Sequence, residues 1–416
     1  MSHVQDILNS MKYFQLLIFI LSIHTNAGQA LKIIYLTDLE GNGKKWDEFI
    51  THSDAFYFDE HKLRLKDDYI LVYGGDATDF GDSSMYILND LLSLKEDCPD
   101  RVHLLIGNRD LNKLFLPFAL REMKSSNISL AESVEHFLSS LNAGKAFSLR
   151  QQELDKRSSH SVTALDVAQS FIKDVEPGGL MFRYIQAAEL GVIIQNTVFV
   201  HGAVNDENFL KMPSGKKAKS VQEWIQKLNL WKDEEFKNWA KNPESSLNLI
   251  RYSKDLDGLI RARYSDKTGN SQIPSDEVIA KLQSDGIDRI VVGHTPNGQS
   301  PTILRENSNF EIVIADNSEC IDCGANIIRI SEDGQILHLK TATTEAGVIE
   351  NELILGKESL VGKKIGEWLI KGVLPDETYI LSRVEQPNFH NRILKTKSLD
   401  PTVLKNIKNL CVSSLY

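Results

Sequence analysis

The stretch Asp68–Gly81, DYILVYGGDATDFG, decides the fold class. It begins with an apolar, branched run and ends abruptly in glycine and aspartate. A short apolar run without polar alternation is typical of a strand that is covered on both faces. In sheets of such strands, functional side chains lie just beyond the C-terminal strand ends. The stretch therefore predicts a buried strand that presents Asp76 and Asp79 at a functional edge.

Four further stretches repeat this pattern of an apolar run that ends in a polar cluster. They are KIIYLTD (32–38), VHLLIGNRD (102–110), VIIQNTVFVHG (192–202) and IDRIVVGH (287–294). Helix-like stretches such as Met85–Leu94 separate some of them, and FEIVIAD (310–316) and GANIIRIS (324–331) follow. Alternating buried strands and helices predict a mixed α/β or α+β domain.

The chain divides into three predicted parts. Residues 1–30 form a leader, residues 31–345 form the main domain, and residues 346–416 form a β-rich extension. Within the main domain, residues 116–190 show helical spacing in segments such as LAESVEHFLSSLNAG. We interpret them as a helical cap inserted into the domain.

The leader resembles a signal peptide. Its apolar run Leu16–Ile23 follows a single Lys12, and the small residues Thr25 and Ala27 stand where a signal peptidase cleaves. We expect the protein to be exported or secreted. A buried or disordered N-terminal segment is the alternative, because this region is weakly basic and also carries Asp6.

Composition excludes several classes of protein. The 416 residues carry a net charge of −10, which argues against a nucleic-acid binder. No apolar run reaches the ~18–20 residues of a membrane span. Four cysteines are too few for a disulfide scaffold. Cys320 and Cys323 are either inert loop cysteines or, in an exported protein, a local disulfide.

Five polar clusters at predicted strand ends carry the chemistry. They are DLEGN (38–42), GDATD (75–79), GNRD (107–110), HG (201–202) and GHT (293–295). Carboxylates, an amide oxygen and two imidazoles suit a pair of divalent ions such as Mn, Fe or Zn. Such a pair activates a water molecule and clamps a phosphoryl group. A single aspartate at a strand end is more often a helix N-cap, so only the full set in this order predicts the metal site.

The order of these clusters resembles the calcineurin-like metallophosphoesterases, and more closely their phosphoprotein phosphatase branch. The resemblance covers about Leu31 to Ile330 and implies a four-layer αββα sandwich with two divalent ions, Mn first and Fe, Zn or Mg as alternatives. It implies that Asp76 bridges the ions. The other implied metal ligands are Asp38, Glu40, Asn108, His201 and His294.

Three residues depart from the family pattern. Glu40 replaces a metal-binding His, Phe80 a phosphate-binding Arg, and Arg109 the catalytic His. A carboxylate at position 40 favours the harder ions Mn and Mg. TDLEGN, GGDATDFG and GNRDLNKL are similar to a narrower subgroup that includes protist phosphatases and the Wip-type effector phosphatases of Legionella. That likeness implies delivery into a host cell as an effector.

Arg109 changes the expected chemistry. Arginine stays charged, so it cannot protonate a leaving oxygen, but it offers two donors to phosphate. We expect Arg109 to pair with Asp79 and to contact the phosphate. A tyrosine phenolate, with a pKa of ~10, leaves without protonation more easily than an alkoxide near ~15.7, by up to roughly 8 kcal/mol. The tyrosine activity of a Wip-type phosphatase points the same way. Asp110 is a reserve general acid, unless it is an ionised helix N-cap.

A second phosphate-binding arginine is expected between His201 and His294. Arg263 and Arg261 are preferred over Arg251, because they lie closer to the final predicted helix. An ordinary surface arginine is the alternative for each.

These features predict a metal-dependent phosphoprotein phosphatase that acts by attack of a metal-activated hydroxide and prefers phosphotyrosine. We expect a monomer whose partner is a phosphorylated protein or peptide, with no nucleic acid and no membrane span. One alternative is a phosphoesterase for small molecules, such as dinucleoside polyphosphates. The other is a catalytically dead module that binds phosphate, which the loss of the catalytic His favours.

Overall fold

A computed structural model describes residues 31–406. It leaves out 126, 244–246, 267–270, 297–300, 306–309, 319–323, 332, 335, 345–346, 356–359, 374–376 and 386–389. The predicted leader and the pair Cys320 and Cys323 lie outside the described residues. Within the described part, none of the helices combines the length and hydropathy that a membrane span requires.

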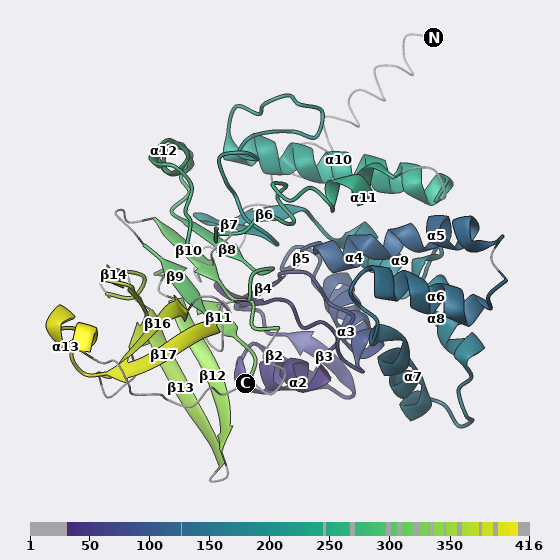
Figure 1. The fold of residues 1–416 in the computed structure, drawn as a ribbon, viewed down its shortest axis with the longest axis horizontal. Helices are drawn as coiled ribbons and strands as arrows, with labels where there is room; N and C mark the ends of the chain where they lie inside the picture. Colours follow the sequence, from purple (N-terminus) through teal and green to yellow (C-terminus); the bar gives the residue numbers. More distant parts are fainter. Residues whose placement is uncertain are drawn as a thin grey trace, which may run out of the picture.

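Two central sheets form the framework (Figure 1). The first has the strand order β13-β12-β11-β1-β4-β5, and the second has the order β6-β7-β8-β10-β9. The strands of the first sheet are β1 (Lys32–Leu36), β4 (Tyr69–Tyr73), β5 (Val102–Leu104), β11 (Ile327–Ile330), β12 (Ile336–Thr344) and β13 (Gly347–Leu355). Those of the second are β6 (Gly191–Ile194), β7 (Thr197–Val200), β8 (Arg289–Val292), β9 (Thr302–Leu304) and β10 (Glu311–Ile314).

The alternation of side chains explains why the site-bearing strands are apolar throughout. In β1, Ile33 and Tyr35 join the core between the sheets, whereas Ile34 and Leu36 join the core on the helical side. Successive residues of a strand point to opposite faces, so a strand covered on both faces must be apolar at every position. The predicted sandwich of mixed sheets with flanking helices is confirmed.

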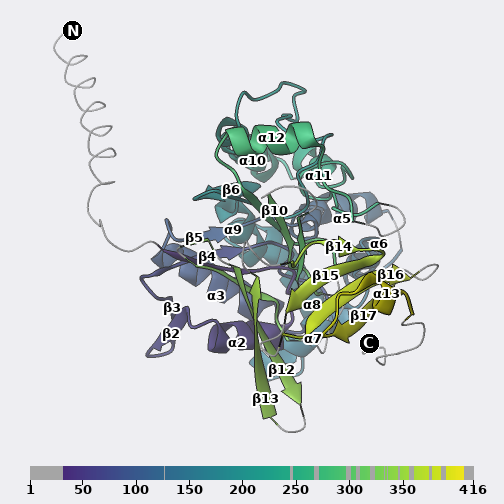
Figure 2. The same ribbon diagram turned by 90° about the vertical axis from the view of Figure 1, so that its left-hand side faces the viewer.

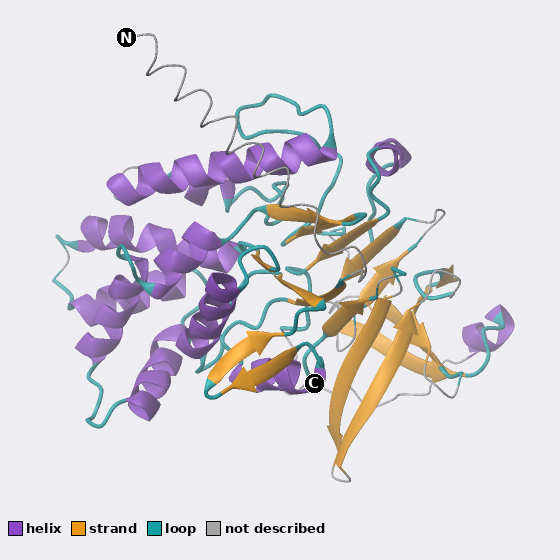
Figure 3. Ribbon diagram, turned by 180° about the vertical axis from the view of Figure 1, so that it is seen from behind, coloured by secondary structure: helices purple, strands orange, loops and turns teal. Residues whose placement is uncertain are grey.

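Helices cover the outer faces of the sandwich (Figure 3). The helices α2 (Gly43–His52) and α3 (Ser84–Asp97) pack near the hairpin of β2 (Phe56–Asp59) and β3 (Lys62–Leu65), and α10 (Val221–Lys241) packs on β6. The short α11 (Asn248–Tyr252) contacts α10, and α12 (Asp276–Ser284) precedes β8.

The cap is a group of short helices packed against one another and against α3. They are α4 (Asn108–Asn112), the 3-10 turn Lys113–Phe115, α5 (Leu116–Met123), α6 (Leu130–Ser140), α7 (Ala146–Arg157), α8 (Ala164–Val175) and α9 (Leu180–Ala187). Capping boxes set two of the starts, with Ser129 opposite Glu132 and Thr163 opposite Asp166. Helices fill most of the predicted cap range 116–190.

The C-terminal region adds a four-stranded sheet, which lies across the central sheets from the cap in Figure 1. It consists of β14 (Lys364–Ile365), β15 (Trp368–Val373), β16 (Tyr379–Glu385) and β17 (His390–Thr396), followed by α13 (Pro401–Asn406). Trp368 and Ile370 join the core between the sheets. The predicted boundary after residue 345 falls between β12 and β13, which pair along their length as one projecting hairpin (Figure 2). This hairpin therefore connects the two predicted parts.

Candidate metal and phosphate site

A cavity of about 650 Å³ lies at the C-terminal ends of the central strands. Residues from the ends of β1, β4, β5, β8 and β10 line it, together with residues 140–142 of the cap. The lining residues that bear on the chemistry are Asp38, Glu40, Asp76, Phe80, Asn108, Arg109, Lys254, Arg261, Arg263, His294 and Asp316. His201 is buried and lies beside Asp76.

Parallel pairing explains how residues far apart in sequence meet there. β1 and β4 pair in parallel with Leu36 opposite Tyr73, and β4 and β5 pair with Tyr73 opposite Leu104. Strands paired in this way end at the same edge, so the clusters that follow them converge. Backbone bonds continue beyond the strands, from Asp38 N to Gly75 O at 3.0 Å and from Gly293 N to His201 O at 2.9 Å.

The backbone is strained where the chemistry is expected. Asp38, Glu40, Asp76 and His294 have φ values of 51°, 48°, 54° and 62°, and Asp79 has a φ of 121°. Positive φ is costly for residues other than glycine and clusters at functional sites. The tight turns also demand glycine, since a Cβ on Gly107 would lie 2.0 Å from Oδ1 of Asp76. These turns place the polar side chains around a single point.

Three buried ligand atoms at this point have no hydrogen-bond partner. They are Asn108 Oδ1, His201 Nε2 and His294 Nε2. One ligand atom each from Asp76, His201 and His294 lie within 4.8 Å of one another. Nδ1 of His201 lies 2.8 Å from the carbonyl oxygen of Gly74 and donates to it, which leaves Nε2 to accept an ion. Unpaired buried polar atoms are costly, so these side chains fit a divalent ion.

Electrostatics support this fit. Burial opposes a charge on His201, but Asp76 and Asp38 raise the pKa of this imidazole to about 10. Burial also works against the ionised form of Asp76, yet the charge on His201 lowers the pKa of Asp76 below its usual value. Burial, and after it His201, lowers the pKa of His294 well below its usual range. In the metal-free protein, the proton on His201 thus provides the positive charge that Asp76 requires.

Carboxylates make up the other side of the site. The Thr37 hydroxyl and the backbone N–H of His294 both donate to Oδ2 of Asp38. Burial, followed by the neighbouring Asp316, raises the pKa of Asp38 well above its usual range. Burial raises the pKa of Glu40 to about 8, against the effect of Arg109, and that of Asp316 to about 6. We call Asn108, His201 and His294 the histidine half, and Asp38, Glu40 and Asp316 the acidic half.

Arg109 links several of the acids. Its Nε lies 2.6 Å from Oε1 of Glu40 and 3.8 Å from Oδ2 of Asp76, and its guanidinium lies 4.4 Å from the centre of the Phe80 ring. The predicted partner Asp79 is farther from Arg109, at 3.7 Å. Asp79 is instead bonded at 2.6 Å to Lys113, which the motif analysis missed. The sequence feature that pointed to Lys113 is its position four residues after Arg109 in GNRDLNKL, which places both on one side of a helical segment.

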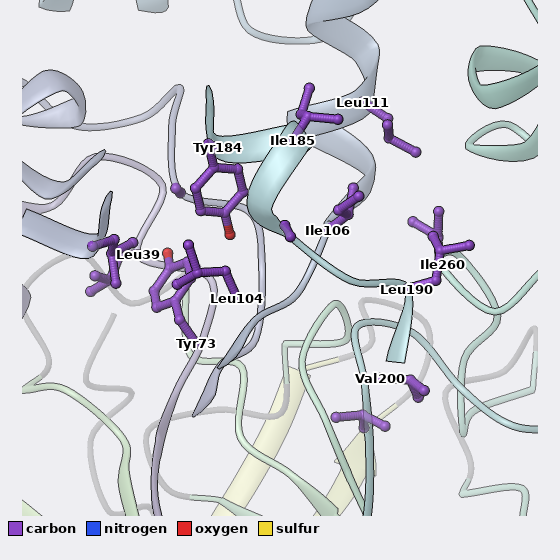
Figure 4. Packing of buried hydrophobic residues seen from close by; sticks show 14 of the residues in the cluster. Leu39, Tyr73, Leu104, Ile106, Leu111, Tyr184, Ile185, Leu190, Val200 and Ile260 are labelled. Atoms are coloured by element: carbon purple, nitrogen blue, oxygen red, sulfur yellow. The ribbon is translucent and has the colours of Figure 1, made fainter. Parts of the chain in front are cut away.

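Asp110 is fully buried and is not among the residues that line the cavity. It accepts hydrogen bonds from the backbone N–H groups of Gly107, Asp76 and Ala77 at 2.8, 2.9 and 3.1 Å. Burial raises the pKa of Asp110 to about 6. These bonds join the turns after β4 and β5, so the geometry gives Asp110 a positioning task. Tyr73 and Leu104, the last residues of β4 and β5, belong with Tyr184 to one apolar core cluster (Figure 4).

Cations line the cavity at its rim. Of the predicted arginines, Arg261 and Arg263 both line it and Arg251 does not. Nε of Arg261 is buried without a partner, while Arg263 is exposed. Lys254, which sequence reasoning missed, also lines the cavity and lies over the Phe115 ring at 4.8 Å. The cavity is therefore lined both by candidate metal ligands and by cations.

The solved structures that match this chain share little sequence with it. A cold-active protein-tyrosine phosphatase of a psychrophile Shewanella species is 15% identical, with 75% of this chain and 78% of that chain covered and a TM-score of 0.46. A protein serine/threonine phosphatase from Saccharomyces cerevisiae is also 15% identical, with 78% of each chain covered and a TM-score of 0.34. A metallophosphoesterase from Sphaerobacter thermophilus is 12% identical over 74% of this chain and 85% of that chain, with a TM-score of 0.33.

Comparison at the level of sequence identifies the family to which the chain belongs. No curated protein matches the chain. Residues 31–298, more than half of the chain, match the profile of the family described as Calcineurin-like phosphoesterase. The chain therefore belongs to the calcineurin-like phosphoesterases.

Proposed function

We propose that this chain is a metal-dependent phosphatase that hydrolyses phosphomonoesters, with phosphotyrosine in a protein or peptide as its preferred substrate. The observation that carries the proposal is the set of three buried, unpaired ligand atoms on Asn108, His201 and His294. A binding module without catalysis has no need for this set, because each unpaired atom costs stability.

The candidate site would hold two divalent ions, one in the histidine half beside Asp76 and one in the acidic half. When bound, the ions supply a nucleophilic water at neutral pH and neutralise the charge of the phosphoryl group. Because the acidic half offers only oxygen atoms, we propose Mn²⁺ as the ion that it takes.

The arginines of the cavity would hold the phosphate. Arg109 reaches the cavity beside Asp76, and Arg261 and Arg263 line its wall. Guanidinium groups bind phosphate oxygens through two parallel hydrogen bonds, which orients the phosphate as well as holding it. Phe80 stacks on the Arg109 guanidinium and limits the positions that this guanidinium can adopt.

The leaving group decides the substrate preference. Arg109 occupies the position of the family's proton donor and cannot give up its proton. Lys113 is buried and bonded to Asp79, and neither Lys113 nor Asp110 lines the cavity. A leaving group that departs with little protonation is favoured when its own pKa is low, which selects phenolate over alkoxide. The exposed positions of Phe80 and Arg263 on the wall allow a peptide-borne side chain to enter.

Hydrolysis of p-nitrophenyl phosphate by the full chain, with and without Mn²⁺, tests the proposal. We expect turnover that depends on Mn²⁺ and that Asp76→Asn abolishes. Asp174→Asn, which removes a carboxylate of the cap outside the site, is the matched control and should retain activity. An absence of turnover with any divalent ion would support a binding module instead. Turnover of dinucleoside polyphosphates but not of phosphopeptides would support the small-molecule alternative.

A further inference from the structure

Asp316 is a buried carboxylate at the site that belongs to none of the five sequence clusters. It follows β10, the last strand of the apolar stretch FEIVIAD. β10 pairs in parallel with β8, with Ile314 opposite Val292. A bond from Ala315 N to Val292 O at 3.0 Å continues the pairing, which places Asp316 beside His294.

The side chain of Asp316 faces the same cavity as the predicted ligands. Asp316 lines this cavity with Asp38, Glu40 and Asp76, although only 2% of the residue is exposed. The backbone N–H of Ser318 donates to its Oδ1 at 2.7 Å. This bond fixes the orientation of the carboxylate without supplying a positive charge.

The buried carboxylates Asp38 and Asp316 lack a directly bonded cation in the described part of the chain. Each is 2% exposed, and neither forms an ion pair with any residue that the structure describes. The nearby cations are bonded to other groups: Arg109 to Glu40, Lys45 to the oxygens of Asn317 at 2.9 and 3.2 Å, and His201 to Asp76 at 3.4 Å. Burying two neighbouring carboxylates without a bonded cation is costly, and a divalent ion beside them would reduce this cost.

We propose that Asp316 is a ligand of the divalent ion in the acidic half, which it shares with Asp38 and Glu40. This inference rests on the metal centre of the proposed function. It assigns to this ion an oxygen ligand that follows β10, the strand that pairs with β8. An ion held by three carboxylates besides Asp76 is a hard ion, since an all-oxygen set suits Mn²⁺ or Mg²⁺.

Calorimetric titration of the metal-free full chain with Mn²⁺ tests this assignment without relying on activity. We expect wild type to bind two ions. In Asp316→Asn we expect one ion to bind as in wild type and the other to bind at least about tenfold more weakly. The matched control Asp174→Asn removes a buried carboxylate of the cap and should bind both ions as wild type does.

The outcomes separate this inference from the proposed function. Two ions bound by Asp316→Asn with wild-type affinities overturn the role of Asp316 and leave the metal centre intact. A wild-type chain that binds no ion overturns both, and one that binds a single ion overturns the ion of the acidic half. Should Asp316→Asn fail to fold, a crystal structure of the wild type with Mn²⁺ gives the answer. A carboxylate oxygen of Asp316 at about 2.0–2.6 Å from an ion supports the inference, and one outside this range overturns it.

Discussion

The two halves of the site differ in what they lack. In the histidine half, the ligand atoms of Asn108, His201 and His294 are buried without a hydrogen bond, and those of His201 and His294 lie within 4.8 Å of one another and of Asp76. In the acidic half, Glu40 is bonded to Arg109, while Asp38 and Asp316 have bonds to N–H or hydroxyl groups but no ion pair. The histidine half is therefore preorganised for an ion. In the acidic half, the main contribution of an ion would be positive charge beside the carboxylates.

The largest expected effect comes from breaking the preorganised half. We predict that His201→Ala lowers kcat/KM for p-nitrophenyl phosphate by about 10³-fold or more, because a catalytic ion contributes several kcal/mol to transition-state stabilisation. Calorimetry should show that the ion of the histidine half is lost. His103→Ala, which removes a histidine that pairs with Glu189 outside the cavity, is the control. Wild-type metal affinity in His201→Ala would contradict the assignment.

Next in size is the removal of the cation behind Asp79. Lys113 and Asp79 are both buried and lie 2.6 Å apart. We predict that Lys113→Met lowers the free energy of unfolding by about 3–5 kcal/mol, because it leaves Asp79 buried next to a single, more distant cation. Urea denaturation measures this value. The exposed pair Lys227 and Glu223 gives the comparison, since Lys227→Met should cost less than about 1 kcal/mol. Equal effects of the two substitutions would refute the structural role of Lys113.

A smaller effect is expected from replacing the guanidinium group of Arg109. Arg109→Lys keeps the positive charge but removes the planar pair of donors. We predict a fall in kcat/KM of about 10–100-fold with both ions still bound, because the guanidinium acts on phosphate and not as an ion ligand. Steady-state kinetics and metal analysis of the same preparation check this prediction. Loss of an ion in Arg109→Lys would show instead that Arg109 organises Glu40 for metal binding.

The pH dependence of metal binding gives the mildest test of the histidine half. An imidazolium cannot ligate, and the pKa of His201 in the metal-free protein is about 10. Rising pH removes this proton, so the affinity for Mn²⁺ should increase by about tenfold per pH unit between pH 7 and pH 9. Calorimetry in two buffers of different ionisation enthalpy should detect proton release. Affinity that is independent of pH, without proton release, would show that His201 is neutral before the ion binds.

Much of the fold and of the site could be predicted because both depend on local pattern. Buried strands such as Tyr69–Tyr73 are apolar at every position, and parallel pairing then collects the clusters at their ends. The two residues that were missed gain their meaning from contacts between distant parts of the chain. The i,i+4 spacing of Lys113 from Arg109 does not reveal its bond to Asp79, and the position of Asp316 after FEIVIAD does not reveal the pairing of β10 with β8.

The boundary of the predicted C-terminal extension also depends on strand pairing that local sequence pattern does not reveal. The pairing of β12 with β13, and of β12 with β11, ties residues on both sides of position 345 to the central sheet. Strand pairing can be predicted from sequence only where polar alternation or turn residues mark it. The choice between Arg261 and Arg263 as the second phosphate-binding arginine stays open because both residues line the cavity.

The account depends most on the proposal that no residue in the described part of the chain protonates the leaving group. The most direct test is kcat/KM of the Mn²⁺-loaded full chain on two peptides of identical sequence, one with phosphotyrosine and one with phosphoserine. The account predicts that kcat/KM is at least about 100-fold higher for the phosphotyrosine peptide. This ratio is smaller than the one that the ~8 kcal/mol of full charge development on the leaving oxygen would give. Equal values for the two peptides would contradict it.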